Sequence, residues 1–126
     1  MSIREAVCAA IIKRDCILLV KKQRTWILPG GKPEAGESDR QCLLREVKEE
    51  LPMLNLQNLR YFGVFTGTTP HKGDALTAKV YLADMNGDIL PGAEINAAKW
   101  VEKPEEYNLS DITRKIILAL RKEGYL

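Results

Sequence analysis

Residues 26–51 place a loop rich in glycine and proline directly before a helix, and this junction constrains the fold more than any other part of the sequence. The loop, 26–37, holds three of the nine glycines and two of the six prolines of the chain. Such a density of glycine and proline requires backbone conformations that other residues rarely adopt. Residues 39–51 contain neither glycine nor proline, so this segment is predicted to be helical.

Local signals mark both ends of the predicted helix. Ser38 stands three residues before Gln41, which is the spacing of a capping box. Pro52 ends the helix, because a proline ring disfavours the helical conformation of the residue before it. An apolar stripe is predicted at positions i, i+3 and i+7, formed by Leu44, Val47 and Leu51.

The rest of the sequence alternates between short apolar runs and polar turns. These runs predict strands at 6–12, 16–20, 61–66, 75–83 and 99–102. The polar tripeptide between the first two runs predicts a β-hairpin. Ser110 is predicted to cap a second helix that Gly124 ends, with a buried face formed by Ile112, Ile116, Ala119 and Leu120. Strands and two helices in this order predict one compact α/β or α+β unit.

Length and composition narrow the class of protein. A chain of 126 residues fits a single domain, 1–126, and 45% hydrophobic with 29% charged residues is typical of a folded protein. A net charge of +2 is too small to predict a nucleic-acid or membrane surface by itself. Cys8, Cys16 and Cys42 form no CxxC pair, which argues against a zinc site or a disulfide framework. Because no apolar stretch approaches the length of about 18 residues that a membrane helix needs, we expect a cytoplasmic protein with reduced thiols.

The predicted helix of residues 39–51 carries an acidic cluster whose spacing indicates metal binding. Glu46, Glu49 and Glu50 stand at i, i+3 and i+4, so their side chains project from the same side. Like charges at this spacing repel by about 0.2–0.5 kcal/mol per pair. A divalent cation bound between them would turn this repulsion into a net attraction. Mg²⁺ takes oxygen ligands and keeps substrate phosphates in its shell. The cluster alone also fits an ordinary solvated helix face.

The order of residues around this cluster resembles the Nudix box, GX5EX7REUXEEXGU, in which U is an aliphatic residue. Seven of its nine specified positions match without a gap, namely Gly31, Glu37, Arg45, Glu46, Val47, Glu49 and Glu50. One position departs from the box, because Pro52 stands in place of its glycine. Proline fixes φ near −65°, so the turn after the helix must differ. On this motif the chain is identified as a member of the Nudix hydrolase family.

The resemblance implies a fold and a set of roles within the box. The fold is an α/β/α sandwich with a mixed β-sheet between helices, and it covers the whole chain. The implied metal ligands are Glu46, Glu49, Glu50 and the carbonyl of Gly30. Glu46 is alternatively the base for the attacking water, and Arg45 would orient a neighbouring glutamate by bidentate hydrogen bonds. Gly31 and Glu37 are expected to be structural first, with Glu37 at the helix N-terminus.

Residues outside the box complete the expected site. By resemblance to MutT-like members, Glu94 is a metal ligand or a base, with an exposed loop carboxylate as the alternative. Three basic residues would meet substrate phosphates or form a solvated strand end: Lys21, Lys22 and Arg24. Trp26 and Tyr81 would stack on a base or lie in the core, and Asp111 would read the base or cap the last helix. His71, in a polar loop, is expected to be incidental.

For activity, the resemblance implies a Mg²⁺- or Mn²⁺-dependent hydrolase that cleaves a diphosphate linkage in a nucleoside diphosphate bonded to another group. The short chain is most similar to MutT-type members, which convert (d)NTPs to monophosphate and pyrophosphate. ADP-ribose, dinucleoside polyphosphates, nucleotide sugars and prenyl diphosphates stay open as substrates, and a non-catalytic nucleotide-binding regulator is the competing class. We expect a small-molecule nucleotide partner, no stable nucleic-acid binding, no membrane, and a monomer or homodimer.

Overall fold

The fold comes from a computed structural model, which describes residues 4–69 and 73–126. Within them the elements in chain order are β1 (Arg4–Lys13), β2 (Cys16–Lys22), β3 (Thr25–Ile27), β4 (Gly30–Gly31), α1 (Asp39–Glu50), β5 (Leu54–Thr68), β6 (Ala75–Gly87), β7 (Ala97–Val101), the 3₁₀ helix η1 (Pro104–Glu106) and α2 (Asp111–Lys122). None of the helices in the described part of the chain has the length and apolarity needed to cross a membrane.

The strands form a mixed sheet in which β1 is central. Its main path runs β3-β2-β1-β6-β5, with β4 paired to β1 and β7 paired to β2. β1 runs parallel to β6 and antiparallel to β2, where it meets β2 only at Ile12–Ile17 and Lys13–Cys16. The hairpin therefore opens quickly, which leaves β1 free to pair with β4 through Val7–Gly31 and Cys8–Gly30.

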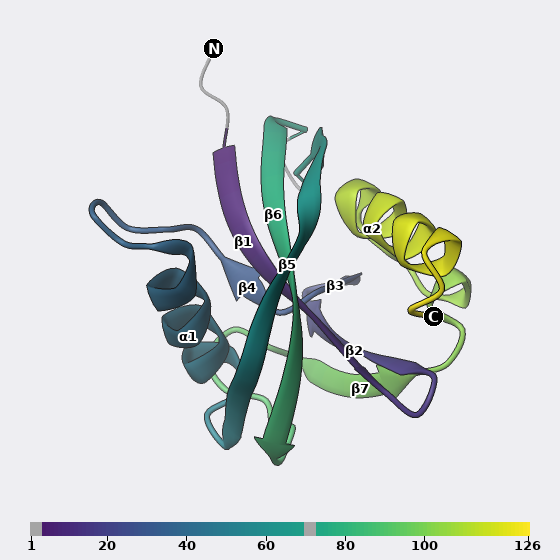
Figure 1. The fold of residues 1–126 in the computed structure, drawn as a ribbon, viewed down its shortest axis with the longest axis horizontal. Coiled ribbons are helices and arrows are strands. Elements are labelled where there is room, and N and C mark those ends of the chain that lie inside the picture. The colour runs from purple at the N-terminus through teal and green to yellow at the C-terminus, as the bar shows by residue number, and fades with distance from the viewer. Residues whose placement is uncertain (1–3, 70–72) are drawn as a thin grey trace.

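The two helices cover opposite sides of the sheet (Figure 1). One buried cluster joins α2 to the sheet through Ile112, Ile116, Ile117 and Leu120, and a second joins α1 to its other side through Cys42, Leu43, Val47 and Leu51. Adjacent residues of β1 face opposite sides of the sheet, with Ala10 in the first cluster and Ile11 in the second, so one strand supplies both cores. The α/β/α sandwich with a mixed sheet is thus confirmed.

The predicted helix termini are confirmed, but one part of the apolar stripe is wrong. Ser38 accepts from the backbone N–H of Gln41 and the Gln41 side chain accepts from Ser38, which completes the capping box of α1. Ser110 caps α2 with one such bond, because its side chain accepts from the backbone N–H of Thr113. Leu44, however, is 37% exposed. The i, i+3, i+7 spacing put it on the buried face, but the core contacts of the first helical turns come from Cys42 and Leu43 instead.

Several strands are longer than predicted, and the short strands β3 and β4 were not predicted. β5 and β6 extend well beyond 61–66 and 75–83, because they pair with each other from Leu54–Gly87 to Thr68–Ala75. Polar residues such as Asn55 and Asn86 take part in this ladder and carry no strand signal of their own. β4 lies inside the segment predicted as a loop. His71, which was expected to be incidental, falls outside the described residues.

Candidate active site

β4 presses two glycines against the carboxylates of α1. Gly30 has φ +147°, and a Cβ there would collide with the backbone oxygen of Val7 in the neighbouring strand. A Cβ on Gly31 would collide with the carboxyl group of Glu46. Only glycine therefore fits at either position without displacing a neighbour. The close approach leaves the backbone of β4 in contact with the acidic face of the helix.

Glu50 is the buried member of the acidic cluster, with only 3% of the residue exposed. The backbone N–H of Gly30 donates to its Oε1 at 3.0 Å, and Lys22 Nζ lies 3.0 Å from its Oε2. Within the described residues no hydrogen-bond donor is aimed at Oε2, which is held by this ion pair. Burial raises the pKa of Glu50, while Lys22 and the Gly30 N–H oppose that rise.

Arg45 is the hub of the exposed part of the cluster. Its guanidinium makes a bidentate contact with Glu37, at 2.7 Å from Nε and 2.9 Å from Nη2. Nη1 donates to Glu46 at 2.9 Å and lies 3.5 Å from Glu49 Oε1, and Nη2 donates to the carbonyl of Lys32. The Arg45 hydrogen bonds lower the pKa of Glu37 to about 2. Arg45 thus ties the loop before α1 to the acidic face: its bidentate contact is with Glu37, and Glu46 receives a single hydrogen bond.

The carboxylates suit a hard divalent cation but do not form a closed cage. Within residues 4–69 and 73–126, no three His, Cys, Asp or Glu side chains converge as a ready-made cation site. Glu46 and Glu49 face Arg45, whereas Glu50 faces Lys22. The side chain of Glu49 is 56% exposed and that of Glu46 is 17% exposed, so a cation from solvent can reach both. Together with Glu50 Oε2 they offer the oxygen donors that Mg²⁺ prefers.

A cavity of about 150 Å³ opens beside this cluster, between β1, β4 and α2. We call it the β1–α2 cavity. Few polar side chains line it. Lys22 lies on the side of the acidic cluster, and the hydroxyls of Ser110 and Thr113 form a hydrogen bond with each other at 2.7 Å. Cys8 also lines it, and burial raises the pKa of that thiol to about 12, which keeps it neutral. The sequence did not predict Cys8 and Thr113 as part of the site, since neither belongs to a local motif.

Three predicted substrate-binding residues lie near one another at the end of β2, but only one lines this cavity. Lys22 does so, whereas Lys21 Nζ lies 5.9 Å above the ring of Trp26. Trp26 packs edge-on against Tyr107 at 5.4 Å between ring centroids. Arg24 is exposed, and its carbonyl accepts a hydrogen bond from Asn108. The cavity itself is lined mainly by apolar side chains from β1 and α2.

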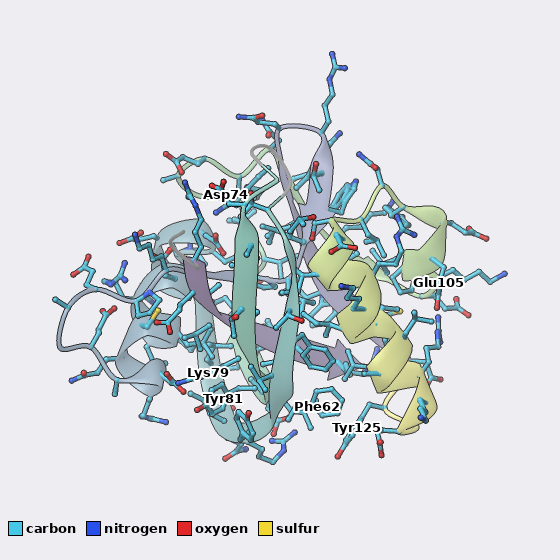
Figure 2. The ribbon with its side chains drawn as sticks, turned by 90° about the horizontal axis from the view of Figure 1, so that it is seen from above. Phe62, Asp74, Lys79, Tyr81, Glu105 and Tyr125 are labelled. Atoms are coloured by element: carbon cyan, nitrogen blue, oxygen red, sulfur yellow. The ribbon has the colours of Figure 1, made fainter. Side chains whose placement is uncertain are left out.

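Tyr81 and Asp111 lie apart from the cavity lining. Figure 2 shows the Tyr81 side chain near that of Lys79. The hydroxyl of Tyr81 donates to Asp39 at 2.7 Å on the α1 side of the sheet, and this bond is the main cause that raises the pKa of Tyr81 to about 12. Asp111, the first residue of α2, accepts from the backbone N–H of Thr68 at 3.1 Å and thereby ties α2 to β5. Both side chains have a structural partner in the described chain.

Comparison with known proteins assigns the chain. The family model described as the NUDIX domain matches residues 2–120. The chain belongs to the Nudix family. Among relatives, the NAD-capped RNA hydrolase NudC of Pseudomonas aeruginosa is 34% identical over 97 residues, which cover 71% of this chain. Those residues make up 33% of NudC, so this Nudix chain spans about a third of that relative's length.

Solved structures show the same Nudix fold. A MutT NUDIX hydrolase from Burkholderia pseudomallei superposes with a TM-score of 0.75 at 26% identity, over 96% of this chain and 98% of its own. A bifunctional NMN adenylyltransferase/ADP ribose pyrophosphatase from Francisella tularensis, solved with AMP and a Mn ion, has a TM-score of 0.80 over 97% of this chain and 42% of its own. At 23% identity, the second likeness concerns the fold alone.

At Pro52, where the sequence departs from the Nudix box, the end of α1 is capped by a loop that comes much later in the chain. The backbone N–H groups of Gly92 and Ala93 donate to the carbonyls of Glu50 and Glu49 at 2.7 and 3.2 Å. These bonds satisfy helix-end carbonyls that a glycine turn would otherwise serve. A Cβ on Gly92 would collide with the Glu49 carbonyl and the Pro52 ring. The same loop carries Glu94, whose φ of +64° is unusual for a residue with a side chain.

Proposed function

We propose that this Nudix chain is a divalent-metal-dependent hydrolase that cleaves a diphosphate linkage in a nucleoside diphosphate bonded to another group. One observation carries the proposal: Glu46 and Glu50 of α1 lie against the glycines of β4, which line the β1–α2 cavity, and Glu49 stands beside them on the same helix. All charged positions of the box are occupied, so the chain keeps what the chemistry requires. For this reason we favour an enzyme over a non-catalytic nucleotide-binding regulator.

Mg²⁺ or Mn²⁺ would be held by the carboxylates of Glu46, Glu49 and Glu50 and the carbonyl of Gly30. Such an ion neutralises charge that develops on phosphate oxygens and lowers the pKa of bound water. Arg45 orients Glu46 through a charge-assisted hydrogen bond. Glu94 is our candidate for the base, because its loop is fixed to the end of α1. Glu46 is the alternative base.

The two ends of the β1–α2 cavity suggest how a substrate would lie. Lys22 places a positive charge between the acidic cluster and the cavity, where it can meet phosphate oxygens. The remaining lining is mainly apolar, with a neutral thiol from Cys8 and two hydroxyls that already bond each other. An uncharged, flat group such as a nucleobase suits this lining better than a second phosphate or a charged sugar.

We take (d)NTPs as the first substrate class, with nucleoside monophosphate and pyrophosphate as products. The similarity to a MutT NUDIX hydrolase over almost the full length of both chains supports this choice. ADP-ribose, dinucleoside polyphosphates and nucleotide sugars are the alternatives. We further propose a monomer or homodimer without stable nucleic-acid binding. The free thiols of Cys8, Cys16 and Cys42 fit a reducing, cytoplasmic location.

The test is release of phosphate or pyrophosphate from a panel of nucleoside triphosphates, ADP-ribose, dinucleoside polyphosphates and nucleotide sugars, with Mg²⁺, Mn²⁺ or EDTA. We expect metal-dependent turnover, fastest for a nucleoside triphosphate and with pyrophosphate as the product. Turnover of another class alone would replace the substrate assignment. No turnover of any class by folded protein, together with metal-dependent nucleotide binding, would support the regulator instead.

A further inference from the structure

The ion pair between Lys22 and Glu50 lies at the boundary between the acidic cluster and the β1–α2 cavity. Glu50 is the most deeply buried carboxylate of the ion pairs in the described part of the chain. Lys22 reaches it from the last position of β2, and the same side chain lines the cavity. One ammonium group therefore adjoins both the carboxylate and the space proposed for substrate.

Glu50 needs the positive charge of Lys22 because its own hydrogen bonds are incomplete. The N–H of Gly30 donates to Oε1, but in the part of the chain that the structure describes Oε2 is paired only with the Lys22 ammonium. A buried carboxylate without a compensating charge is strongly unfavourable. Burial alone would lower the pKa of Lys22, but the charge and hydrogen bond of Glu50, together with the charges of Glu46 and Glu94, raise it. Glu50 thus keeps Lys22 charged, and the Lys22 ammonium partly offsets the burial of Glu50.

A divalent cation bound by Glu50 through Oε2 would come to the same oxygen that Lys22 approaches. Two cations at one carboxylate oxygen repel each other, so the ammonium must move away. Lysine can do so, because its charge sits on a flexible four-carbon stem. Arg45 differs, since Glu37 and Glu46 fix its guanidinium.

We propose that Lys22 is an exchangeable counter-ion, which holds Glu50 in place and yields its Oε2 to the divalent cation, so that its ammonium turns to a phosphate group in the β1–α2 cavity. This inference rests on the proposed function, because it takes Glu50 as a metal ligand. It makes metal binding and phosphate binding mutually favourable through one side chain. Lys22 acts here as a positioning residue, through Glu50.

The first test compares Lys22→Met with Lys99→Met. The control makes the same substitution at a lysine of β7, in the same sheet. Melting temperatures are measured in EDTA and in saturating MgCl₂, and the Mg²⁺ affinity by calorimetry. We expect Lys22→Met to melt lower than wild type in EDTA, to gain more from Mg²⁺, and to bind Mg²⁺ about fivefold tighter or more. Lys99→Met should respond to Mg²⁺ as wild type does. An equal or smaller gain for Lys22→Met would overturn the proposal.

The second test uses the wild-type protein, so it holds even if Lys22→Met fails to fold. The side-chain ¹⁵N and ¹H resonances of the Lys22 ammonium, assigned by their loss in Lys22→Arg, are followed during titration with Mg²⁺ and then with inorganic pyrophosphate. We expect a shift with Mg²⁺ and a further shift with pyrophosphate. Mg²⁺ binding that leaves these resonances unmoved would refute the exchange and spare the proposed function. No Mg²⁺ binding at all would refute both.

Discussion

Arg45 donates two parallel hydrogen bonds to Glu37, from Nε to Oε2 at 2.7 Å and from Nη2 to Oε1 at 2.9 Å. Glu37 precedes α1 and Arg45 lies in its second half, so the contact folds the loop back along the helix. The third nitrogen of the guanidinium, Nη1, is then left to hold Glu46. One arginine thereby orders the loop and orients a predicted metal ligand.

Replacing Arg45→Lys should reduce activity much more than it reduces folding. Lysine keeps the charge but cannot bind two carboxylates with a rigid fork, so Glu46 loses its orientation. We expect kcat/KM on the best substrate to fall by about 10–100-fold. The matched control is Arg121→Lys, because Arg121 of α2 makes a similar bidentate contact with Glu105 of η1. Equal losses in the two variants would show that the fork at Arg45 has no special role.

Glu37 should make stability depend on pH in the acid range. Its pKa is lowered from 4.5 to about 2 by the Arg45 hydrogen bonds and a backbone N–H from Glu34. A lowered folded-state pKa means that its stabilisation is complete above about pH 4.5 and is lost as the pH falls toward 2. The melting temperature of wild type should therefore exceed that of Glu37→Gln near neutrality and converge with it near pH 2. A difference that stays constant with pH contradicts this.

Gly31→Ala should displace a carboxylate while leaving the fold intact. The added Cβ meets the side chain of Glu46, which can rotate away, rather than a rigid backbone. We expect a melting temperature near that of wild type and Mg²⁺ binding weakened by about tenfold or more. Gly63→Ala in β5 is the control, because its Cβ would make only ordinary contact with Phe65. If Gly31→Ala binds Mg²⁺ normally, Glu46 does not need the position it occupies.

Glu94→Gly should separate stability from activity. The left-handed backbone of Glu94 costs roughly 1–2 kcal/mol in a residue with a side chain, and glycine removes that cost. We expect an unchanged or raised melting temperature with a large loss of turnover, which is the pattern of backbone strain kept for function. Asp15→Gly, at φ +65° in the β1–β2 turn, should be stabilised without loss of turnover. Full activity of Glu94→Gly would exclude Glu94 as base or ligand.

The parts of the fold that sequence predicted correctly are those set by near neighbours. The capping box of Ser38 and Gln41, the stop at Pro52 and the cap at Ser110 each depend on residues within a few positions. Leu44 was placed wrongly because periodicity gives the buried face only to within about one position, and the packing of α1 selects among neighbours. The strand β4 was missed because pairing with β1, not propensity, makes it a strand.

In the candidate site, the box supplied the carboxylates and the arginine, but not the contacts that hold them. Lys22, at the end of β2, meets Glu50, at the end of α1, only in the folded chain, and no local pattern signals that meeting. The cap from Gly92 is likewise a product of tertiary structure, which a sequence pattern shows only as a departure at Pro52. Local chemistry was therefore readable from the sequence, while counter-ions and caps from distant segments required the fold.

The most direct test of the central claim is Mg²⁺-dependent hydrolysis by Glu49→Gln beside Glu106→Gln. Glutamine keeps the size of Glu49 and removes its charge, and Glu49 is exposed enough that folding should not depend on it. Glu106, in η1, controls for the loss of one exposed carboxylate. We expect Glu49→Gln to lose more than about a hundredfold in kcat with an unchanged melting temperature, while Glu106→Gln stays active. Equal turnover by both variants would contradict a metal-dependent active site on α1.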